Sequence, residues 1–139
     1  MNGLAGDERG SILPLLAGYL ALALAVVLVC VNGIDLLVTQ RRIDSLADAA
    51  ALAASDGFEI VPGPAGVTLE LNPATAHDQA AEVVRVSPGS AWLVGVDLDG
   101  PTTARATVAD LWEPKILGIV VPAGVVLTAT GTSRASLAG

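Results

Sequence analysis

The feature that most constrains this chain is an uncharged run near its N-terminus. From Ser11 to Ile34 no residue carries a charge, and residues 12–31 are almost wholly apolar. A helix of about 20 apolar residues rises about 30 Å, which is the thickness of the hydrocarbon core of a bilayer. Buried helices of globular proteins rarely run this far without a charge. The run therefore predicts a transmembrane helix over residues 11–33, preceded by an N-terminal tail at residues 1–10.

The start and the processing of this helix are also predictable. Ser11 is expected to cap the helix and Pro14 to lie in its first turn, where a missing N–H costs least. A signal peptide has a hydrophobic region of about 7–15 residues, whereas here residues 26–29 stay apolar beyond the small residues that could mark a cleavage site. A lipoprotein signal would need a small residue before its cysteine, but Val29 precedes Cys30. Both comparisons favour an uncleaved anchor.

Small residues recur along one face of the predicted span. Ala17, Ala21 and Ala25 lie four residues apart, and Gly18 follows Ala17. Small residues at this spacing let helices approach closely in lipid. These four residues are candidate contacts with a partner helix, and chance spacing in an alanine-rich chain is the alternative.

Beyond the span the pattern becomes amphipathic. Apolar residues recur at helical spacing, at Leu36, Ile43, Leu46, Ala50 and Ala53. No proline interrupts residues 15–61, and Asp56-Gly57 supplies a C-terminal stop. We therefore predict one long helix over about residues 12–54, with a bend at Gly33 and a juxtamembrane amphipathic segment at residues 34–57. Three charged residues of this segment are candidate polar contacts for a partner, or else anchors at the membrane interface: Asp35, Arg41 and Arg42.

The remaining residues, 58–139, predict a small α+β domain. Asn72-Pro73 starts a helix that ends near Val86, because asparagine is a good N-cap and proline suits the first helical position. Pro62-Gly63-Pro64 is expected to be a loop. Strands are expected at residues 67–71, 92–98, 104–112 and 125–132, with the second and third forming a hairpin. On the second strand Trp92, Val94, Val96 and Leu98 are expected to share one face. The whole is an antiparallel sheet packed on one helix.

Composition excludes several function classes. The chain carries 14 acidic and 7 basic residues, and a net charge of −7 argues against nucleic acid as a partner. The single cysteine excludes an intrachain disulfide and a cysteine-rich zinc site. No motif marks a nucleophilic serine beside His77, the only histidine, so we expect an exposed helix residue there and no enzyme. No cofactor or metal is expected, and Trp92 and Trp112 are expected to be core anchors.

The N-terminal third of the sequence carries two segments that together are characteristic. Arg9-Gly10-Ser11 precedes the span. The segment that follows it reads Gln40-Arg41-Arg42-Ile43-Asp44-Ser45-Leu46-Ala47-Asp48-Ala49-Ala50-Ala51-Leu52-Ala53. This arrangement resembles the TadE/TadG-like group of bacterial tight-adherence (Tad, or Flp) pilus-assembly proteins. In that group an Arg-Gly precedes the membrane helix, and a basic stretch leads into an Ala-Asp-Ala-Ala-Ala-Leu-Ala motif. The resemblance covers about residues 8–57.

The resemblance implies a pseudopilin-like protein with a pilin-like fold. It would be a single-pass protein of the cytoplasmic (inner) membrane with its domain outside the cytoplasm. Its partners would be membrane lipid and other subunits of a Tad/Flp pilus or secretion filament. Prepilin-type members are cut after a glycine and have glutamate as the fifth mature residue. If the processing site were Gly10-Ser11, that fifth residue would be Leu15, so we expect no cleavage.

The orientation in the membrane rests on two conflicting signals. One arginine, Arg9, precedes the span, and two, Arg41 and Arg42, follow it closely. The positive-inside rule therefore mildly favours an N-out orientation. The resemblance implies N-in and C-out, which is the orientation we adopt.

Three function classes follow from these patterns. The first is an assembly component of a Tad/Flp-type pilus that acts by helix packing and subunit contacts. The second is a single-pass membrane-anchored binding module unrelated to pili. The third, an anchored hydrolase, is disfavoured because catalytic motifs are absent from the sequence.

Overall fold

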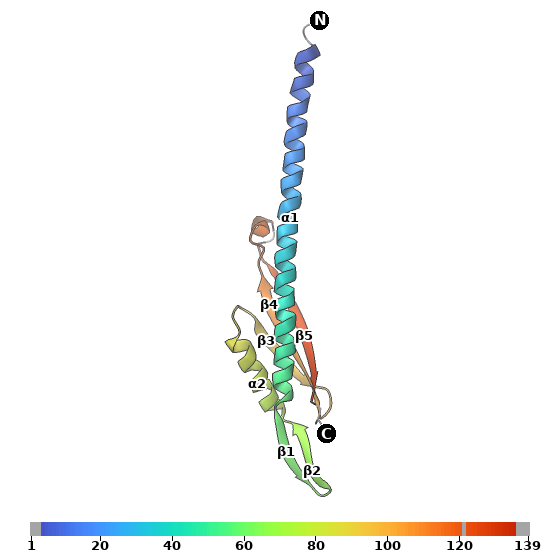
Figure 1. Cartoon of the computed structure of the whole chain (residues 1–139). Helices are drawn as coiled ribbons and strands as arrows, with labels where there is room; N and C mark the ends of the chain where they lie inside the picture. The colour runs from blue at the N-terminus through green and yellow to red at the C-terminus, as the bar shows by residue number, and fades with distance from the viewer. Residues whose placement is uncertain (1–3, 121, 136–139) are drawn as a thin grey trace.

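One continuous helix dominates the molecule. The computed structural model describes residues 4–120 and 122–135, with side chains from Ile12 onward. Helix α1 spans Leu4–Ser55, and its 52 residues make it about 78 Å long. Figure 1 shows it running without a break past Gly33, where a bend was predicted.

The predicted start of α1 at Ser11 is wrong. The helix begins at Leu4, so Ser11 is not its N-cap and Pro14 lies inside it rather than in its first turn. The residues before Ser11 include alanine, aspartate, glutamate and arginine, and none of residues 4–9 breaks a helix as proline does. Pro14 removes the backbone hydrogen bond that its own N–H would have donated and crowds the carbonyl four residues earlier, yet α1 continues through it.

The two halves of α1 have opposite environments. The N-terminal half stands free of the rest of the molecule, and the C-terminal half packs against β-strands and a second helix (Figure 1). The C-terminal half supplies much of the hydrophobic core through its buried residues Ile43, Leu46, Ala47, Ala50, Ala51 and Ala54. The C-terminal half of α1 is therefore an integral part of the folded body.

The helix ends at the predicted Asp56-Gly57 step. The amides of Asp56 and Gly57 donate to the carbonyls of Ala53 and Ala54, which closes the last turn. Gly57 is needed here because its backbone passes close to the next helix. A Cβ on Gly57 would lie 2.8 Å from the backbone nitrogen of Ala76.

A hairpin then projects from the end of the molecule opposite the N-terminus (Figure 1). Strand β1, Phe58–Gly63, pairs antiparallel with strand β2, Gly66–Leu71, as a separate two-stranded sheet. The prediction of a loop at Pro62-Gly63-Pro64 is wrong for its first two residues, which belong to β1. A strand with a free edge tolerates proline, and the turn falls at residues 64–65 instead.

Helix α2, Pro73–Val86, has the bounds that the sequence predicts. The Asn72 side chain accepts hydrogen bonds from the amides of Ala74 and Thr75. Its buried face consists of Ala76, Ala80 and Val84, which pack against α1. Alanine at the contact lets the two helix backbones approach closely.

The main sheet has three strands in the order β3-β4-β5. These are β3, Trp92–Leu98; β4, Thr103–Trp112; and β5, Val125–Arg134, all antiparallel. Ala104, Ala106 and Val108 of the central strand are buried. Gly131 of β5 lies directly against α1, since a Cβ there would lie 2.3 Å from the carbonyl oxygen of Ala47. The 3-10 helix η1, Leu117–Ile119, lies in the connection between β4 and β5.

A β-bulge in β3 changes which of its side chains face the core. The register of β3 against β4 shifts between Leu93 and Gly95. The extra residue reverses the alternation, so Leu93, Val96 and Leu98 pack against the core while Trp92 and Val94 are largely exposed. The prediction that Trp92 and Val94 share a face with Val96 and Leu98 is therefore wrong.

Candidate functional site

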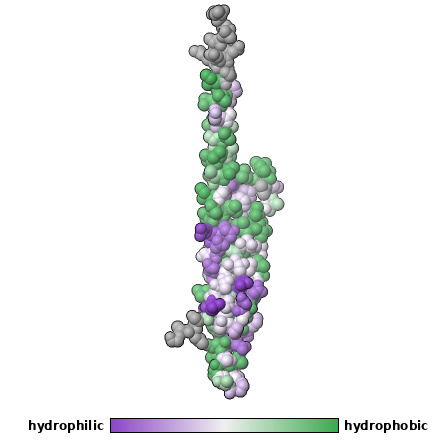
Figure 2. Space-filling model, turned by 90° about the vertical axis from the view of Figure 1, so that its right-hand side faces the viewer, coloured by the Kyte–Doolittle hydropathy of each residue, from purple (hydrophilic) through white to green (hydrophobic). Residues whose placement is uncertain are grey.

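The bare half of α1 is the most unusual surface of the molecule. From Ile12 to Val27 the helix side chains are exposed, and the bulky ones among them show 54–71% of their surface. Figure 2 shows this surface as almost continuously hydrophobic. A single helix of this composition is long and apolar enough to cross a membrane. Bulk lipid or a partner helix would remove this area from water.

The predicted small-residue contacts lie on this bare half. Ala17, Gly18, Ala21 and Ala25 are all exposed, and nothing within the described structure lies within 4 Å of a Cβ built on Gly18. The ridge is thus open to a neighbour. For the predicted processing site, Gly10-Ser11, the structure describes only a helical backbone.

Asp35, the first acidic residue after the apolar run, ties the long helix to the far end of the sheet. Its carboxylate accepts a hydrogen bond from Nε1 of Trp112 at 3.0 Å and lies 3.5 Å from Nζ of Lys115. We call these three residues the collar, because they join the body to α1 where the uncharged run meets the charged segment. Trp112 is half-buried and Trp92 is 44% exposed, so neither is the core anchor that was predicted.

A second ion pair lies farther along the helix. Nη2 of Arg42 donates to Oδ2 of Asp110 at 2.7 Å, and Asp110 is only 2% exposed. Oδ1 of Asp110 accepts from Oγ of Ser90 at 2.6 Å and from the amide of Leu111 at 2.9 Å. A buried carboxylate is stable only when paired and hydrogen-bonded, and here three donors meet that need.

The polar residues predicted as partner contacts therefore differ in what they touch. Asp35 and Arg42 bind side chains of the same chain. Arg41 is exposed. The structure thus brings Asp35 and Arg42 to the sheet and leaves Arg41 and the small-residue ridge open to other molecules.

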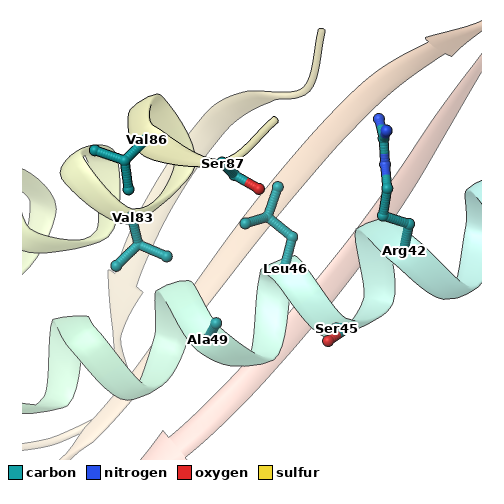
Figure 3. Close-up of a pocket in the computed structure, with 7 residues that line it drawn as sticks. All are labelled: Arg42, Ser45, Leu46, Ala49, Val83, Val86 and Ser87. Atoms are coloured by element: carbon teal, nitrogen blue, oxygen red, sulfur yellow. The ribbon is translucent and has the colours of Figure 1, made fainter. Parts of the chain in front are cut away.

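A shallow groove separates α1 from α2. It has a volume of about 490 Å³ and is lined by Leu46 and Ala49 from α1 and by Val83 and Val86 from α2. Figure 3 shows the Leu46 and Val83 side chains pointing into the space between the helices. Arg42 is the only charged residue of its lining, so the groove offers apolar contact but no pair of groups for acid–base chemistry.

Titratable groups on α2 lie at the surface. His77 is exposed, as predicted, and its Nδ1 lies 3.9 Å from Oδ1 of exposed Asp78. The pKa of Glu82 is lowered, because Arg85 donates hydrogen bonds to its carboxylate and adds a favourable charge interaction. Among the side chains that the structure describes, from Ile12 to Val120 and from residue 122 to residue 135, no three of His, Cys, Asp or Glu are grouped to hold a metal ion.

A protein-family model matches most of the long helix. Residues 10–57 match the family model described as "Putative Flp pilus-assembly TadE/G-like". The N-terminal region of this chain is therefore similar to that family, and we call residues 10–57 the TadE/G-like region. No curated protein and no solved structure gives a significant match to the chain. The TadE/G-like region is about a third of the chain and is almost all of α1 together with the two residues that end it.

The TadE/G-like region contains only the α1 residue of each of the two polar contacts described above, the collar and the Arg42–Asp110 pair. Asp35 and Arg42 lie inside it, while Trp112, Lys115 and Asp110 come from the β4 end, outside it. Sequence reasoning missed these three partners. Trp112 and Asp110 stand in a predicted strand, where the spacing of residues says nothing about which helix residue they will meet.

Proposed function

We propose that this protein is a single-pass, pseudopilin-like component of a Tad/Flp-type pilus or secretion-filament assembly system. The observation that carries the proposal is that the TadE/G-like match falls on a helix with a bare apolar half and a half built into a domain. That division suits a protein held in lipid or among other helices at one end and presenting a folded body at the other.

In this proposal the chain acts by contact and performs no catalysis. The bare half of α1 packs in the membrane, with Ala17, Gly18, Ala21 and Ala25 as the face toward a partner helix. Arg41 is a further contact on the exposed side of the helix, and Asp35 and Arg42 act mainly by fixing the domain on α1. The partners are lipid and other subunits of the assembly system.

The proposed location is the cytoplasmic membrane with the domain outside the cytoplasm. Residues 1–10 form the N-terminal tail, residues 11–33 cross the membrane, and residues 34–57 lead into the domain at residues 58–139. The test is protease treatment of intact spheroplasts, which should remove the C-terminal domain. A domain that stays intact until the membrane is permeabilised would contradict this orientation.

The subunit contact is tested by cysteine crosslinking in membranes that contain the whole assembly system. The native Cys30 is replaced by alanine, and a cysteine is placed at Ala21 or, as the matched control, at Ala23. These two alanines point about 200° apart around the helix. Ala21→Cys should give a discrete adduct with another subunit, and Ala23→Cys should give much less.

Two outcomes would contradict the assembly role. One is the absence of any protein adduct at Ala21. The other is normal filament assembly in cells that lack the protein, which would favour a membrane-anchored binding module unrelated to pili.

A further inference from the structure

The connection between β4 and β5 presents an apolar tip that the domain leaves uncovered. Ile119 is 95% exposed, Val120 is 75% exposed and Ile116 is 43% exposed. Figure 2 shows this connection as a mainly hydrophobic lobe standing beside α1, above the hydrophilic patches of the body. Isoleucine and valine at such exposure are costly in water, since burying each contributes about 1.5–3 kcal/mol.

The height of this lobe along α1 is fixed by contacts. Lys115, next to Ile116, reaches the Asp35 carboxylate, and Trp112 donates to the same group. The face of α1 just before Asp35 is the only part of the uncharged run that is not fully exposed in the described structure. Asn32 is 5% exposed and Leu28 is half-buried. Both views place the lobe beside α1 at this level (Figures 1 and 2).

These contacts put the lobe level with the end of the uncharged run. Asn32 and Leu28 precede Asp35 by about 4.5 and 10.5 Å along the helix axis at 1.5 Å per residue. If residues 11–33 cross the bilayer, Asn32 and Leu28 lie about 1.5 and 7.5 Å inside the end of the span at Gly33, so a segment beside them lies within about 8 Å of the membrane surface. Amphipathic segments that lie in the membrane interface are buried to that depth.

From this geometry we infer that the η1 segment, residues 116–120, is a second membrane-contacting element that inserts Ile119 and Val120 into the leaflet nearest the domain. The inference rests on the proposed transmembrane helix. Lipid is the occupant because the exposed tip continues the bare apolar surface of α1. The tip is also much smaller than the roughly 800 Å² per partner of a stable protein interface.

The local chemistry suits an interface between lipid and water. Lys115, whose side chain is 81% exposed, lies at the base of the lobe, where its ammonium group can reach lipid phosphates. The turn itself satisfies part of its backbone, because the amide of Val120 donates to the carbonyl of Leu117 at 2.8 Å. A backbone hydrogen-bonded in this way costs less to place in an apolar environment.

The test uses the full-length protein in liposomes, with Cys30 replaced by alanine and one environment-sensitive fluorophore attached per variant. The label is placed on Ile119→Cys. Val67→Cys is the matched control, because it is another exposed β-branched residue, 68% exposed, on the hairpin at the far end of the body. Leu22→Cys reports independently on the transmembrane helix.

The expected result is a blue-shifted emission at Ile119 that lipids with a doxyl group near the headgroup quench. The Val67 label should be quenched only by aqueous iodide, and the Leu22 label by deeply placed doxyl groups.

Three outcomes would contradict the inference. A lipid-protected Leu22 label together with an iodide-accessible Ile119 label would overturn the insertion of the η1 segment and leave the transmembrane helix standing. An iodide-accessible Leu22 label would overturn the transmembrane helix and the insertion with it. A blue shift at Ile119 that doxyl lipids do not quench and that vanishes when the protein is diluted in lipid would assign the tip to protein contact instead.

Discussion

At the scale of single residues, Asp110 has the most demanding environment in the described structure. It is 2% exposed, and its two carboxylate oxygens accept from a guanidinium, a hydroxyl and an amide. Replacing it removes the charge that faces Arg42 and leaves a buried site with unmatched donors. The guanidinium can still reach water, because the Arg42 side chain is 48% exposed.

We expect Asp110→Ala to lower the free energy of unfolding by about 1–3 kcal/mol, from three lost hydrogen bonds that include a charged one. Asp110→Asn should cost less, because its amide oxygen can still accept from Ser90 and Leu111. Denaturant unfolding in detergent, followed by tryptophan fluorescence, measures both. Asp97→Asn, at an exposed position of β3, is the control and should change the free energy of unfolding little. Equal stability of all three variants would contradict a structural role for the Asp110 pair.

Glu82 gives a prediction about pH. Its pKa is lowered by the Arg85 hydrogen bonds, so its carboxylate stabilises the folded state above the pKa of the unfolded chain. That contribution is lost as the pH falls through the lower pKa of the folded state. Arg85→Ala should raise the pKa of Glu82 in an NMR titration, whereas Arg105→Ala should leave it unchanged. A Glu82 pKa that is the same in all three proteins would show that the pair does not persist in solution.

At the scale of elements, the seam between α1 and β5 depends on a glycine. The Cβ of an alanine at Gly131 would meet the backbone of α1, with the carbonyl oxygen of Ala47 at 2.3 Å and the amide nitrogen of Asp48 at 2.6 Å. Backbone atoms cannot move aside as a flexible side chain can. The helix and the strand would have to separate, which would loosen the core around Ala47 and Ala129.

Gly131→Ala should therefore destabilise the protein by about 1–3 kcal/mol or more, as overpacking of a close contact does. Gly95→Ala is the matched control, because Gly95 is also a strand glycine and its Cβ would meet nothing within 4 Å. The midpoint of thermal unfolding in detergent measures the difference. A Gly131→Ala protein as stable as the Gly95→Ala protein would show that α1 and β5 do not approach so closely.

Most elements could be predicted from the sequence because each has a local cause. The apolar run and the proline-free stretch predict α1, and the Asn72-Pro73 step predicts α2. The turn residues at 99–101 predict β4 as the second strand of a hairpin, and alternation predicts β5. The bulge in β3 could not be predicted, because it depends on how one strand pairs with the next. Strand β1 was not predicted, because Pro62 and Gly63 are typical of loops. The free edge of this two-stranded sheet tolerates both residues.

The candidate site divides in the same way. The bare apolar helix and its small residues follow from composition and spacing. The collar does not, because Asp35 and Trp112 are 77 residues apart, and only the packed sheet brings them together. The exposed tip at Ile119 was also missed, because an apolar residue in a loop looks the same in sequence whether it is buried or exposed.

At the scale of the whole molecule, the folded body includes the second half of α1. Its core joins residues of α1 to Leu71, Ala76, Ala104, Val108 and Ala129 of the later elements. The later elements alone would expose the apolar surface that α1 covers. A domain of about 80 residues buries too little apolar surface to lose the part that α1 covers and stay stable.

A fragment of residues 34–139 should therefore fold, and a fragment of residues 58–139 should not. The longer fragment keeps Ile43, Leu46, Ala47 and Ala50 of α1, and we expect a dispersed NMR spectrum and cooperative unfolding. The shorter one should give a collapsed spectrum and aggregate. A folded 58–139 fragment would show that the helix is only an attachment for an independent domain.

If α1 spans the membrane as proposed, its unbroken course through the collar lets the helix and the folded body tilt together about the membrane surface. Transmembrane helices tilt by about 20° on average. Ser55 lies about 30 Å beyond Asp35 along the axis, so such a tilt would carry the base of the β1–β2 hairpin about 10 Å sideways. A neighbouring subunit that leans on the helix inside the bilayer would thus reposition the far end of the body without any change in its fold.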